Sequence, residues 1–369
     1  MAHQQINVGV VGGSLNNQWA SQTHLPVLNE HPNYTLKAIG TSHMESAKKS
    51  AALYKALPFD DHKKLIRSED VDLVVVSVKV PFHYEIVKEA ISEGKHIYCE
   101  WPLGKNTQEA EELEKRANQK KIHHAVGLQA RQSPEINYLK KALESKEIGE
   151  VRSCTMEIAT HAKGRITDQR SAYLLKRGNG ASLLTINGGH ALDVLCYLLG
   201  DFKEISAITN TNYKEALIRE TGKSVMKDTA DQIMIHGTLK NGISVSAHIQ
   251  AGVYPKFKLE IKGEKGVFRL TQPYSVGHVQ FGGLKLEKIS HQDYSDLDSV
   301  VEKAHIEEVK VSRENGKGPK EYIENAYTVF AQDILGHKRE IPNFNDAVKL
   351  HYLLDKVQES AETGRKIKL

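Results

Sequence analysis

A run of eight residues, Val71 to Val78 (VDLVVVSV), constrains the fold of this chain more than any other segment. Its almost unbroken apolar character indicates a strand buried on both faces, as in a parallel sheet covered by helices. Short apolar strands and helical segments alternate on both sides of it. The strands are expected at residues 6–11, 36–40, 71–78, 95–99 and 124–128, and the helices at 19–29, 45–54, 82–93 and 107–120. This alternation predicts βαβ units and a doubly wound α/β domain.

The chain has 369 residues, which is too long for one compact core, so two domains are expected. After Glu150 the pattern changes to a series of alternating strands, and Asn241-Gly242 is a strong hairpin signal between two of them. We therefore place a dinucleotide-binding Rossmann domain at residues 1–128. An α+β domain for substrate binding and oligomerisation follows at residues 129–369.

Composition excludes several classes of protein. The formal net charge is +4 and basic residues are interspersed with acidic ones, which argues against nucleic acid as the main partner. Cys99, Cys154 and Cys196 lie far apart, so we expect a reducing compartment and no disulfides. No signal peptide and no apolar stretch of about 20 residues is visible, which predicts a cytoplasmic protein without membrane contact. The histidines lack metal-ligand spacing, so no metal is expected.

The loop after the first strand reads Gly12-Gly13-Ser14-Leu15-Asn16-Asn17. A dinucleotide fingerprint has three glycines here, which let backbone N–H groups approach a pyrophosphate. Ser14 and Asn17 stand at the second and third glycine positions, and Ser14 and Asn16 offer side-chain donors instead. A tight turn without a ligand is the alternative. We favour nucleotide binding, because the loop follows the first strand of a doubly wound sheet.

The second strand ends in Gly40-Thr41-Ser42-His43. An acidic residue at this point usually binds the ribose 2′-hydroxyl group of NAD. Because no carboxylate would repel a 2′-phosphate, and Thr41, Ser42 and His43 could contact one, the segment favours NADP or tolerance of both cofactors. The alternative is that these residues cap the next helix, with Ser42 as the N-cap and Glu45 three residues later, and the two roles are compatible.

Three long segments carry a resemblance to a known family, at residues 71–106, 178–200 and 325–369. They are similar to the glucose-fructose oxidoreductase and inositol dehydrogenase (Gfo/Idh/MocA) family of NAD(P)-dependent enzymes, over nearly the whole chain. The resemblance implies a Rossmann domain followed by a domain with a large, mostly antiparallel open sheet. It also implies a carbohydrate substrate and a homodimer or homotetramer formed through that sheet.

Within the family, the chain resembles the branch of the yeast galactose-pathway repressor. The glycine-poor segment Gly13–Ala20, the segment Glu100–Leu103 and the segment Leu128–Pro134 carry this likeness. That repressor binds a dinucleotide but acts by masking a transcriptional activator. The resemblance therefore implies two different functions.

The family's catalytic motif is Glu-Lys-Pro, and here the triplet is Glu100-Trp101-Pro102. An indole N–H group is a donor only, so Trp101 cannot exchange a proton at neutral pH. A second motif has an aspartate four residues before a histidine, and this chain has Ile186 before His190. His190 titrates near neutrality in its ordinary state and is expected to be the general acid or base.

Further site residues follow from proximity to the His190 motif, for Lys163 and Asn187, or from the resemblance. Lys163 and Asn187 would polarise or anchor the substrate oxygen, and the phenol of Tyr173 is an alternative acid. His83 matches the family's loop over the cofactor, and Arg131 a position that reaches the cofactor-facing cleft. The expected cofactor-binding residues are Gly12, Gly13, Ser14, Leu15, Asn16, Thr41, Ser42, Val78, Val80, Pro81, His83, Glu100, Trp101, Pro102, Gln129 and Arg131.

Two residues near these motifs have several interpretations. Trp101 would form a flat wall against the nicotinamide or a sugar face, or fill the lysine position and block chemistry, or simply pack in the core. We consider core packing the least favoured of the three. Asp193 lies three residues after His190 on the same helical face, where it would orient the histidine or pair with a cation.

The leading hypothesis is an NAD(P)-dependent oxidoreductase that transfers a hydride to or from a sugar or polyol-like substrate, with His190 as the acid or base. The alternative is a catalytically silent dinucleotide-binding regulatory protein that recognises a protein partner. Non-redox or internal redox chemistry with a retained cofactor also fits this fold.

Overall fold

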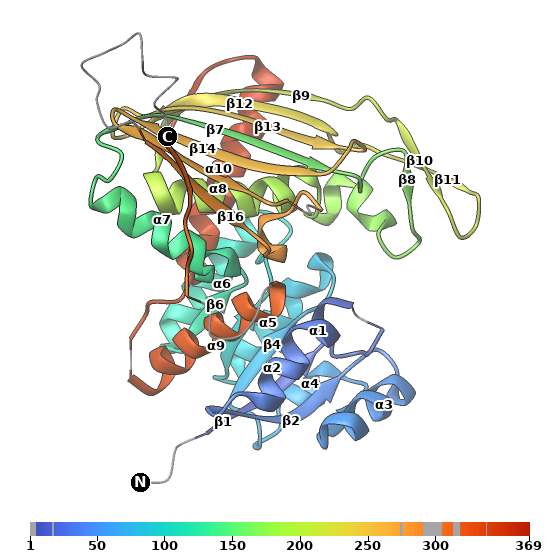
Figure 1. The fold of residues 1–369 in the computed structure, drawn as a ribbon. Helices are drawn as coiled ribbons and strands as arrows, with labels where there is room; N and C mark the ends of the chain where they lie inside the picture. The colour runs from blue at the N-terminus through green and yellow to red at the C-terminus, as the bar shows by residue number, and fades with distance from the viewer. Residues whose placement is uncertain (1–4, 17, 274–275, 291–304, 313–317, 337) are drawn as a thin grey trace. The chain divides into compact units, whose positions relative to one another are not determined.

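The computed structural model describes residues 5–16, 18–273, 276–290, 305–312, 318–336 and 338–369, and they form two compact units (Figure 1). Unit 1 comprises Met1–Gln129 and Gly318–His351, and unit 2 comprises Ala130–Lys317 and Tyr352–Leu369. The division after Gln129 lies next to the expected boundary. Unit 2 is not one continuous stretch, however, because residues 318–351 belong with the N-terminal sheet.

Unit 1 contains a parallel sheet of six strands in the order β3-β2-β1-β4-β5-β6. Its strands are β1 (Ile6–Val11), β2 (Tyr34–Gly40), β3 (Leu57–Phe59), β4 (Leu73–Val76), β5 (His96–Cys99) and β6 (His124–Val126). All neighbouring strands pair in parallel. The order reverses between β1 and β4, and the crevice beyond the carboxyl ends of strands at such a point is where ligands bind in open α/β sheets. The predicted doubly wound domain is confirmed.

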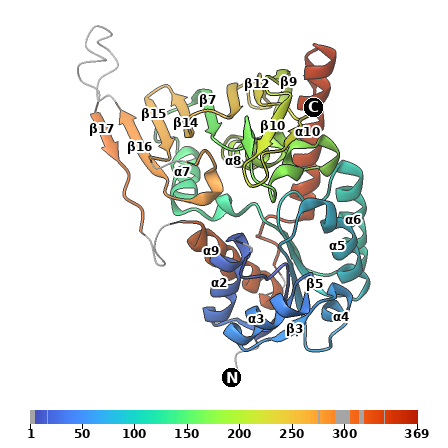
Figure 2. The ribbon, with the colours of Figure 1, turned by 90° about the vertical axis from the view of Figure 1, so that its right-hand side faces the viewer.

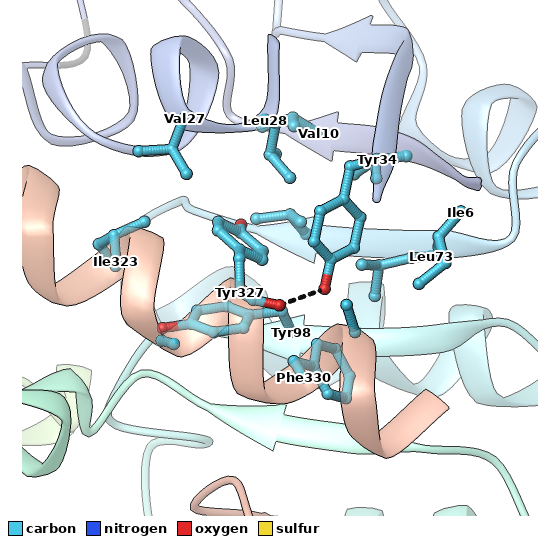
Figure 3. Close-up of a cluster of buried hydrophobic side chains, with 14 of the residues drawn as sticks. Ile6, Val10, Val27, Leu28, Tyr34, Leu73, Tyr98, Ile323, Tyr327 and Phe330 are labelled. Carbon is cyan, nitrogen blue, oxygen red and sulfur yellow. Dashed lines mark hydrogen bonds between the residues drawn. The ribbon is translucent and has the colours of Figure 1, made fainter. Parts of the chain in front are cut away.

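Burial of β4 on both faces explains its unbroken apolar sequence. All four of its residues are fully buried. Leu73 and Val75 belong to a core cluster formed with α2 (His24–Glu30) and α9 (Pro319–Gly336), and Val74 and Val76 point to the opposite face because side chains alternate along a strand. Figure 3 shows Tyr327 and Phe330 of α9 in this cluster. A helix from late in the chain thus completes the core of the N-terminal sheet.

Polar atoms inside this cluster are paired with one another. The Tyr34 hydroxyl group donates a hydrogen bond to the Tyr327 carbonyl oxygen at 2.8 Å (Figure 3). The Tyr327 hydroxyl group lies 2.8 Å from Nδ1 of the fully buried His24. Nε2 of His24 lies 2.9 Å from Oε1 of Glu100, at the end of β5. The network therefore links α9, α2 and the Glu100-Trp101-Pro102 triplet.

The N-terminal part of unit 1 contains five more helices. They are α1 (Gln18–Gln22), α3 (Met44–Tyr54), α4 (His62–Ile66), α5 (His83–Ser92) and α6 (Thr107–Lys120), and all but α4 lie close to predicted helices. The expected helix at 19–29 is divided into α1 and α2 at Thr23. Gly94 follows α5 with φ 70°, a left-handed conformation that glycine adopts without strain. The short β3 and α4 were not predicted, because segments of three and five residues carry almost no periodic signal.

Unit 2 is built on a nine-stranded sheet in the order β17-β16-β15-β14-β7-β13-β12-β9-β18. The strands are β7 (Val151–Thr160), β9 (Phe202–Asn210), β12 (Gln232–Leu239), β13 (Ser244–Ala251), β14 (Lys256–Gly263), β15 (Gly266–Thr271), β16 (Lys285–Ser290), β17 (His305–Glu308) and β18 (Ile367–Lys368). Only β7 and β13 pair in parallel, so the predicted mostly antiparallel sheet is confirmed. β12 and β13 flank the predicted Asn241-Gly242 hairpin turn.

One face of this sheet is covered by helices. Figures 1 and 2 show α7 (Pro134–Glu144) and α8 (Gly189–Leu199) along it. Along β13, Val245, Ala247, Ile249 and Ala251 are buried, while the residues that alternate with them are more exposed to solvent. This is the pattern of a sheet with one solvated face. A small sheet of β8 (Ile166–Thr167), β10 (Glu215–Ile218) and β11 (Ser224–Met226) extends from this unit, and α10 (Phe344–Thr363) runs across the division between the units.

The tyrosine network predicts unequal costs for two similar substitutions. Tyr327→Phe leaves Nδ1 of buried His24 without its partner and should lower the free energy of unfolding by about 1–3 kcal/mol. Tyr34→Phe removes a donor to a helical carbonyl oxygen and should cost only about 1 kcal/mol. Urea unfolding of the two variants beside the wild type measures both. Equal costs would show that the contact with His24 adds nothing to stability.

Candidate active site

The loop after β1 lies at the strand-order reversal of unit 1. Gly12 has φ 94°, and a Cβ atom there would lie 2.1 Å from the Ser77 carbonyl oxygen at the end of β4. Only glycine fits this position. The N–H groups of Gly12 and Gly13 both donate to the Gly40 carbonyl oxygen, at 2.9 and 3.1 Å. The two glycines therefore hold the loop against its neighbouring strands.

The next residues of the loop carry the polar groups. The Ser14 hydroxyl oxygen accepts a hydrogen bond from the Asn16 N–H group at 3.2 Å, and the Leu15 N–H group donates to the Ser50 hydroxyl oxygen at 3.2 Å. The segment from Gly12 to Gln22 contains no acidic residue. Hydroxyl and N–H groups without a carboxylate fit the phosphate groups of a dinucleotide.

The end of β2 is polar but not acidic. The Thr41 hydroxyl group bonds to the His43 carbonyl oxygen and to Ser46, at 2.8 and 2.6 Å. Helix α3 begins at Met44 with His43 as its N-cap residue, whose side chain makes no capping bond. The alternative role of Ser42 as the N-cap was therefore wrong. Ser42 and His43 are exposed, and their contact with a ribose or 2′-phosphate stays a prediction.

His83 joins two of the predicted cofactor segments. Its side chain is buried, with Nδ1 2.7 Å from the Pro102 carbonyl oxygen and Nε2 3.0 Å from the Val78 carbonyl oxygen. Burial lowers its pKa. The imidazole thereby holds the Val78–Phe82 segment, which contains Val80 and Pro81, beside the Glu100-Trp101-Pro102 triplet.

Trp101 is a core residue of unit 1. Its side chain is only 5% exposed, and its ring centroid lies 4.7 Å from that of His351 on α10. Burial lowers the pKa of His351 to about 4, so Trp101 packs against a neutral imidazole. Core packing was the interpretation of Trp101 that we favoured least from the sequence. Its burial and its contact with His351 support that interpretation. Trp101, at the position of the family's lysine, does not exchange a proton at neutral pH.

A lysine that could take this chemical role lies in unit 2, in the loop between β7 and β8. Lys163 has φ 63°, an unusual conformation for a residue other than glycine that is often found at functional sites. The next residue, Gly164, packs so closely on Gly252 that a Cβ atom would lie 2.3 Å from the Gly252 Cα atom. This close approach fixes the backbone that presents Lys163.

The ammonium group of Lys163 lies in a polar but uncharged environment. Nζ donates to Oδ1 of Asn187 at 2.8 Å, and Nδ2 of Asn187 donates to the Gly277 carbonyl oxygen at 3.2 Å. In the part of the chain that the structure describes, no carboxylate lies within ion-pair distance of this ammonium group. Removal from water lowers the pKa of Lys163 to about 8. The group therefore exchanges a proton near neutral pH.

His190 is the second residue of α8, which follows directly on an unusual π-helical turn (Leu183–Gly188) that carries Asn187. π-Helical turns are frequent at functional sites. His190 is 1% exposed, and its Nδ1 atom has no hydrogen-bond partner among the described residues. Burial and then the charge of Lys163 lower the pKa of His190 to about 3. The imidazole is therefore neutral at physiological pH and binds a proton too weakly for the role of general base expected from the sequence.

A second histidine, His278, lies beside His190, with ring centroids 5.1 Å apart. It was not predicted, because no motif surrounds it in the sequence.

Asp193 pairs with Arg131 through Nε at 3.0 Å, so of its two expected roles the structure supports the ion pair. Arg131 and Gln129 fall on opposite sides of the division between the units.

Lys163 also lines a pocket of about 370 Å³ in unit 2. Its other lining residues are Thr160, His161, Ala162, Ile166, Thr167, Asp168, Ser171, Leu174, Leu175, Arg219, Pro255 and Val276. Tyr173 lies between Ser171 and Leu174 in the sequence but does not line the pocket. It is half-buried, and burial raises its pKa. Of the four predicted catalytic residues, Lys163 alone lines this pocket, Asn187 accepts its hydrogen bond, and His190 lies near enough for the charge of Lys163 to lower its pKa.

Comparison with known proteins identifies the family. Residues 6–128 match the family model of the Gfo/Idh/MocA oxidoreductases with an NAD-binding Rossmann fold, and residues 134–272 match that of the Gal80p C-terminal domain. The dehydrogenase aclE of Aspergillus oryzae is 30% identical over 292 residues, which cover 74% of this chain and 79% of that protein. The chain belongs to the Gfo/Idh/MocA family.

Other members of the Gfo/Idh/MocA family include both regulators and enzymes. The galactose/lactose metabolism regulatory protein GAL80 of Kluyveromyces lactis is 30% identical over 308 residues, covering 76% of this chain and 66% of that protein. A super-repressor mutant of Gal80p from Saccharomyces cerevisiae has the same fold, with a TM-score of 0.87, 23% identity and coverage of 99% and 97% of the two chains. Levoglucosan dehydrogenase in complex with NADH and levoglucosan also shares the fold, with a TM-score of 0.83, 21% identity and 99% of each chain covered.

No group of three or more metal-ligating side chains converges among the residues that the structure describes. None of the described helices is both long and apolar enough to cross a membrane.

The Lys163–Asn187 contact predicts opposite pKa changes for two substitutions. Asn187→Asp places a carboxylate beside the ammonium group and should raise the pKa of Lys163 above about 8, because a negative neighbour favours the charged form. Asn187→Leu removes the accepting oxygen and should lower it further. Titration of ¹³C-dimethylated lysines by NMR, assigned with Lys163→Arg, measures both. Unchanged titration in both variants would contradict the contact.

Proposed function

We propose that this protein is an NAD(P)-dependent oxidoreductase that interconverts a CH–OH group and a carbonyl group of a sugar- or polyol-like substrate, with Lys163 exchanging the proton. The observation that carries the proposal is the ammonium group of Lys163, which lines a pocket, bonds to a neutral amide and has a pKa of about 8. General acid–base catalysis is most efficient when the pKa lies near the operating pH. The enzymes among the relatives support the substrate class.

The chain's own residues would divide the work as follows. In the oxidation direction, the neutral amine of Lys163 accepts the hydroxyl proton of the substrate while Asn187 holds the amine in place. His190, neutral because of its low pKa, donates or accepts a hydrogen bond at the substrate oxygen. Lys163 thus takes the role of base that the sequence assigned to His190, and supplies the amine that Trp101 lacks.

The dinucleotide fits unit 1. The loop from Gly12 to Asn16 would hold its phosphate groups, and Thr41 to His43 its adenosine ribose. Bound NAD(P)⁺ supplies the acceptor for the hydride that leaves the CH–OH carbon. We expect NADP to be accepted as well as NAD because no carboxylate stands at the end of β2.

Purified protein titrated with NADH and NADPH by fluorescence, and then screened with sugars and polyols for absorbance change, tests the proposal. Turnover should occur, and Lys163→Met should lower kcat at least about 100-fold while dinucleotide affinity is kept. Lys223→Met, at an exposed lysine of the same unit, is the matched control and should keep full activity. Tight dinucleotide binding without turnover across the panel would refute the proposal.

The pH dependence gives a second test. Because the base is the neutral amine, kcat/KM for oxidation should rise with pH through about pH 8 and level off above it. For reduction the ammonium form is the acid, so the rate should fall over the same range. A midpoint near pH 6 would instead point to a histidine, and would contradict the role of Lys163.

The end of β2 predicts a change in cofactor preference. Ser42→Asp places a carboxylate where a 2′-phosphate would lie, and should weaken NADPH relative to NADH by about tenfold because of charge repulsion at an exposed site. Ser42→Asn is the neutral control. Fluorescence titration measures both affinities, and an unchanged ratio would show that Ser42 lies away from the ribose.

A regulatory function is the second candidate, and one observation favours it. Trp101 is buried against His351 at the position of the family's catalytic lysine, so the usual proton-exchanging group is absent from unit 1. A regulator would bind the dinucleotide and recognise a protein partner without turnover. Turnover that depends on Lys163 distinguishes the two functions. The oligomeric state stays a prediction of a homodimer or homotetramer.

A further inference from the structure

Lys163 lines a pocket whose surface is mostly apolar. The volume of about 370 Å³ falls in the range of sites that hold small molecules. Six of the lining residues are apolar, namely Ala162, Ile166, Leu174, Leu175, Pro255 and Val276. Such a lining favours a ligand with an apolar body, and it places the amine of Lys163 beside that body.

The amine of Lys163 is not paired with a carboxylate in the part of the chain that the structure describes. Its one hydrogen bond there is to Oδ1 of Asn187, at 2.8 Å. Asp168 is the acidic residue of the pocket lining, and its carboxylate is engaged elsewhere. It accepts a hydrogen bond from the Ser171 N–H group at 2.7 Å and lies 4.0 Å from Nη2 of Arg219. No described negative charge therefore holds Lys163 in its ammonium form.

The imidazoles around Lys163 do not supply such a charge either. His161 lines the same pocket, and burial together with the charge of Lys163 lowers the pKa values of His190 and His278. With a pKa of about 8, roughly one Lys163 side chain in ten is the neutral amine at pH 7. For an exposed lysine with an ordinary pKa the fraction is about one in 2,500.

Lys227 shows the opposite arrangement in the same unit. Its side chain is fully buried, Nζ lies 3.1 Å from Oδ2 of Asp231, and it also donates to the Thr229 carbonyl oxygen. Lys227 does not line the pocket. An ammonium group that is paired with a carboxylate keeps its proton and offers no lone pair, so Lys227 is structural. Lys163 differs from it both in its partner and in its access to a cavity.

We propose that Lys163 is a nucleophile that captures small aldehydes and ketones with an apolar body as an imine in the pocket of unit 2. Lysine amines in apolar pockets are well suited to form Schiff bases with carbonyl compounds. The nitrogen lone pair bonds to the carbonyl carbon, and the π electrons of the C=O bond move to the oxygen, which takes a proton. Loss of this oxygen as water leaves the protonated imine. In sum, R–NH₃⁺ and R′CHO give R–NH⁺=CHR′ and one water molecule.

This capture goes beyond the proposed dehydrogenase and needs neither dinucleotide nor hydride transfer. It is reversible, because water adds back to the imine and releases the carbonyl compound. While the imine exists, the nitrogen of Lys163 cannot accept the proton of a hydroxyl group. Aldehydes with an apolar body are therefore expected to be inhibitors of any reaction that depends on this amine.

Reductive trapping without dinucleotide tests the capture. The protein is treated at pH 7 with benzaldehyde and sodium cyanoborohydride, which reduces the imine to a stable benzylamine, and the labelled lysines are located by peptide mass spectrometry. Lys163 should be labelled at least about tenfold faster than the exposed Lys223, because more of it is neutral. Lys163→Arg should remove the fast label, and Lys223→Arg should keep it. Equal labelling rates at the two lysines would overturn the proposal.

Two neighbouring apolar residues test whether the aldehyde binds in the pocket. Ile166 of β8 and Leu217 of β10 are cross-strand neighbours, 55% and 42% exposed, and of the two only Ile166 lines the pocket. Ile166→Ser should slow the labelling of Lys163 at least about threefold because apolar contact is lost, and Leu217→Ser should leave it unchanged. Melting temperatures show that both variants are folded. Unchanged labelling in Ile166→Ser would overturn the proposal.

The capture and the dehydrogenase can fail separately. Labelling of Lys163 in a protein that turns over no substrate would refute the dehydrogenase and leave the capture standing. Turnover that depends on Lys163, without fast labelling by benzaldehyde, would overturn the capture and leave the dehydrogenase standing.

Discussion

The parallel sheet of unit 1 imposes a constraint that shapes much of the chain, since it must be covered on both faces. The four residues of β4 are fully buried, and alternate ones point to opposite faces. On one face the cover comes from α2 and from α9, about 190 residues after the last strand of that sheet. The return of α9 makes unit 1 discontinuous. It also brings Tyr327 to His24, and through His24 to Glu100 at the end of β5.

A second constraint acts in unit 2, where a half-buried ammonium group has one neutral amide as its described partner. In such surroundings the charged form is disfavoured, and the pKa of Lys163 falls to about 8. Burial lowers the pKa values of His190 and His278, and the positive charge of Lys163 lowers them further, so both imidazoles are neutral. One amine able to exchange a proton and two neutral imidazoles able to pair with hydroxyl groups form a chemically coherent set. This is the basis for proposing an oxidoreductase of polyol-like substrates despite Trp101.

The chain resembles both enzymes and regulators, and it departs from the family's catalytic motifs at two positions. The family's catalytic lysine position is occupied by a tryptophan that serves the core of unit 1, and the aspartate position by Ile186. Loss of the lysine and of the aspartate would inactivate an active site that depended on those two groups alone. Lys163, presented by a left-handed backbone conformation and held by Asn187, offers the same chemical function from another element. The activity that we propose would therefore depend on a residue outside the two familiar motifs.

The sequence by itself determined the fold class, because periodicity and burial pattern are local properties that a single chain displays. Residue types and spacing predicted the helix at Thr107–Lys120, the hairpin at Asn241-Gly242 and a strand at Val71–Val78, which the structure has as β4 (Leu73–Val76). It also indicated Lys163, Asn187 and His190 as site residues, through a family resemblance. It could not show which of them exchanges a proton, since pKa values depend on burial and on neighbours distant in sequence. Nor could it reveal His278, the packing of Trp101 against His351, or the pairing of Asp193 with Arg131. Those were decided by tertiary structure, because each depends on contacts between segments that only folding brings together.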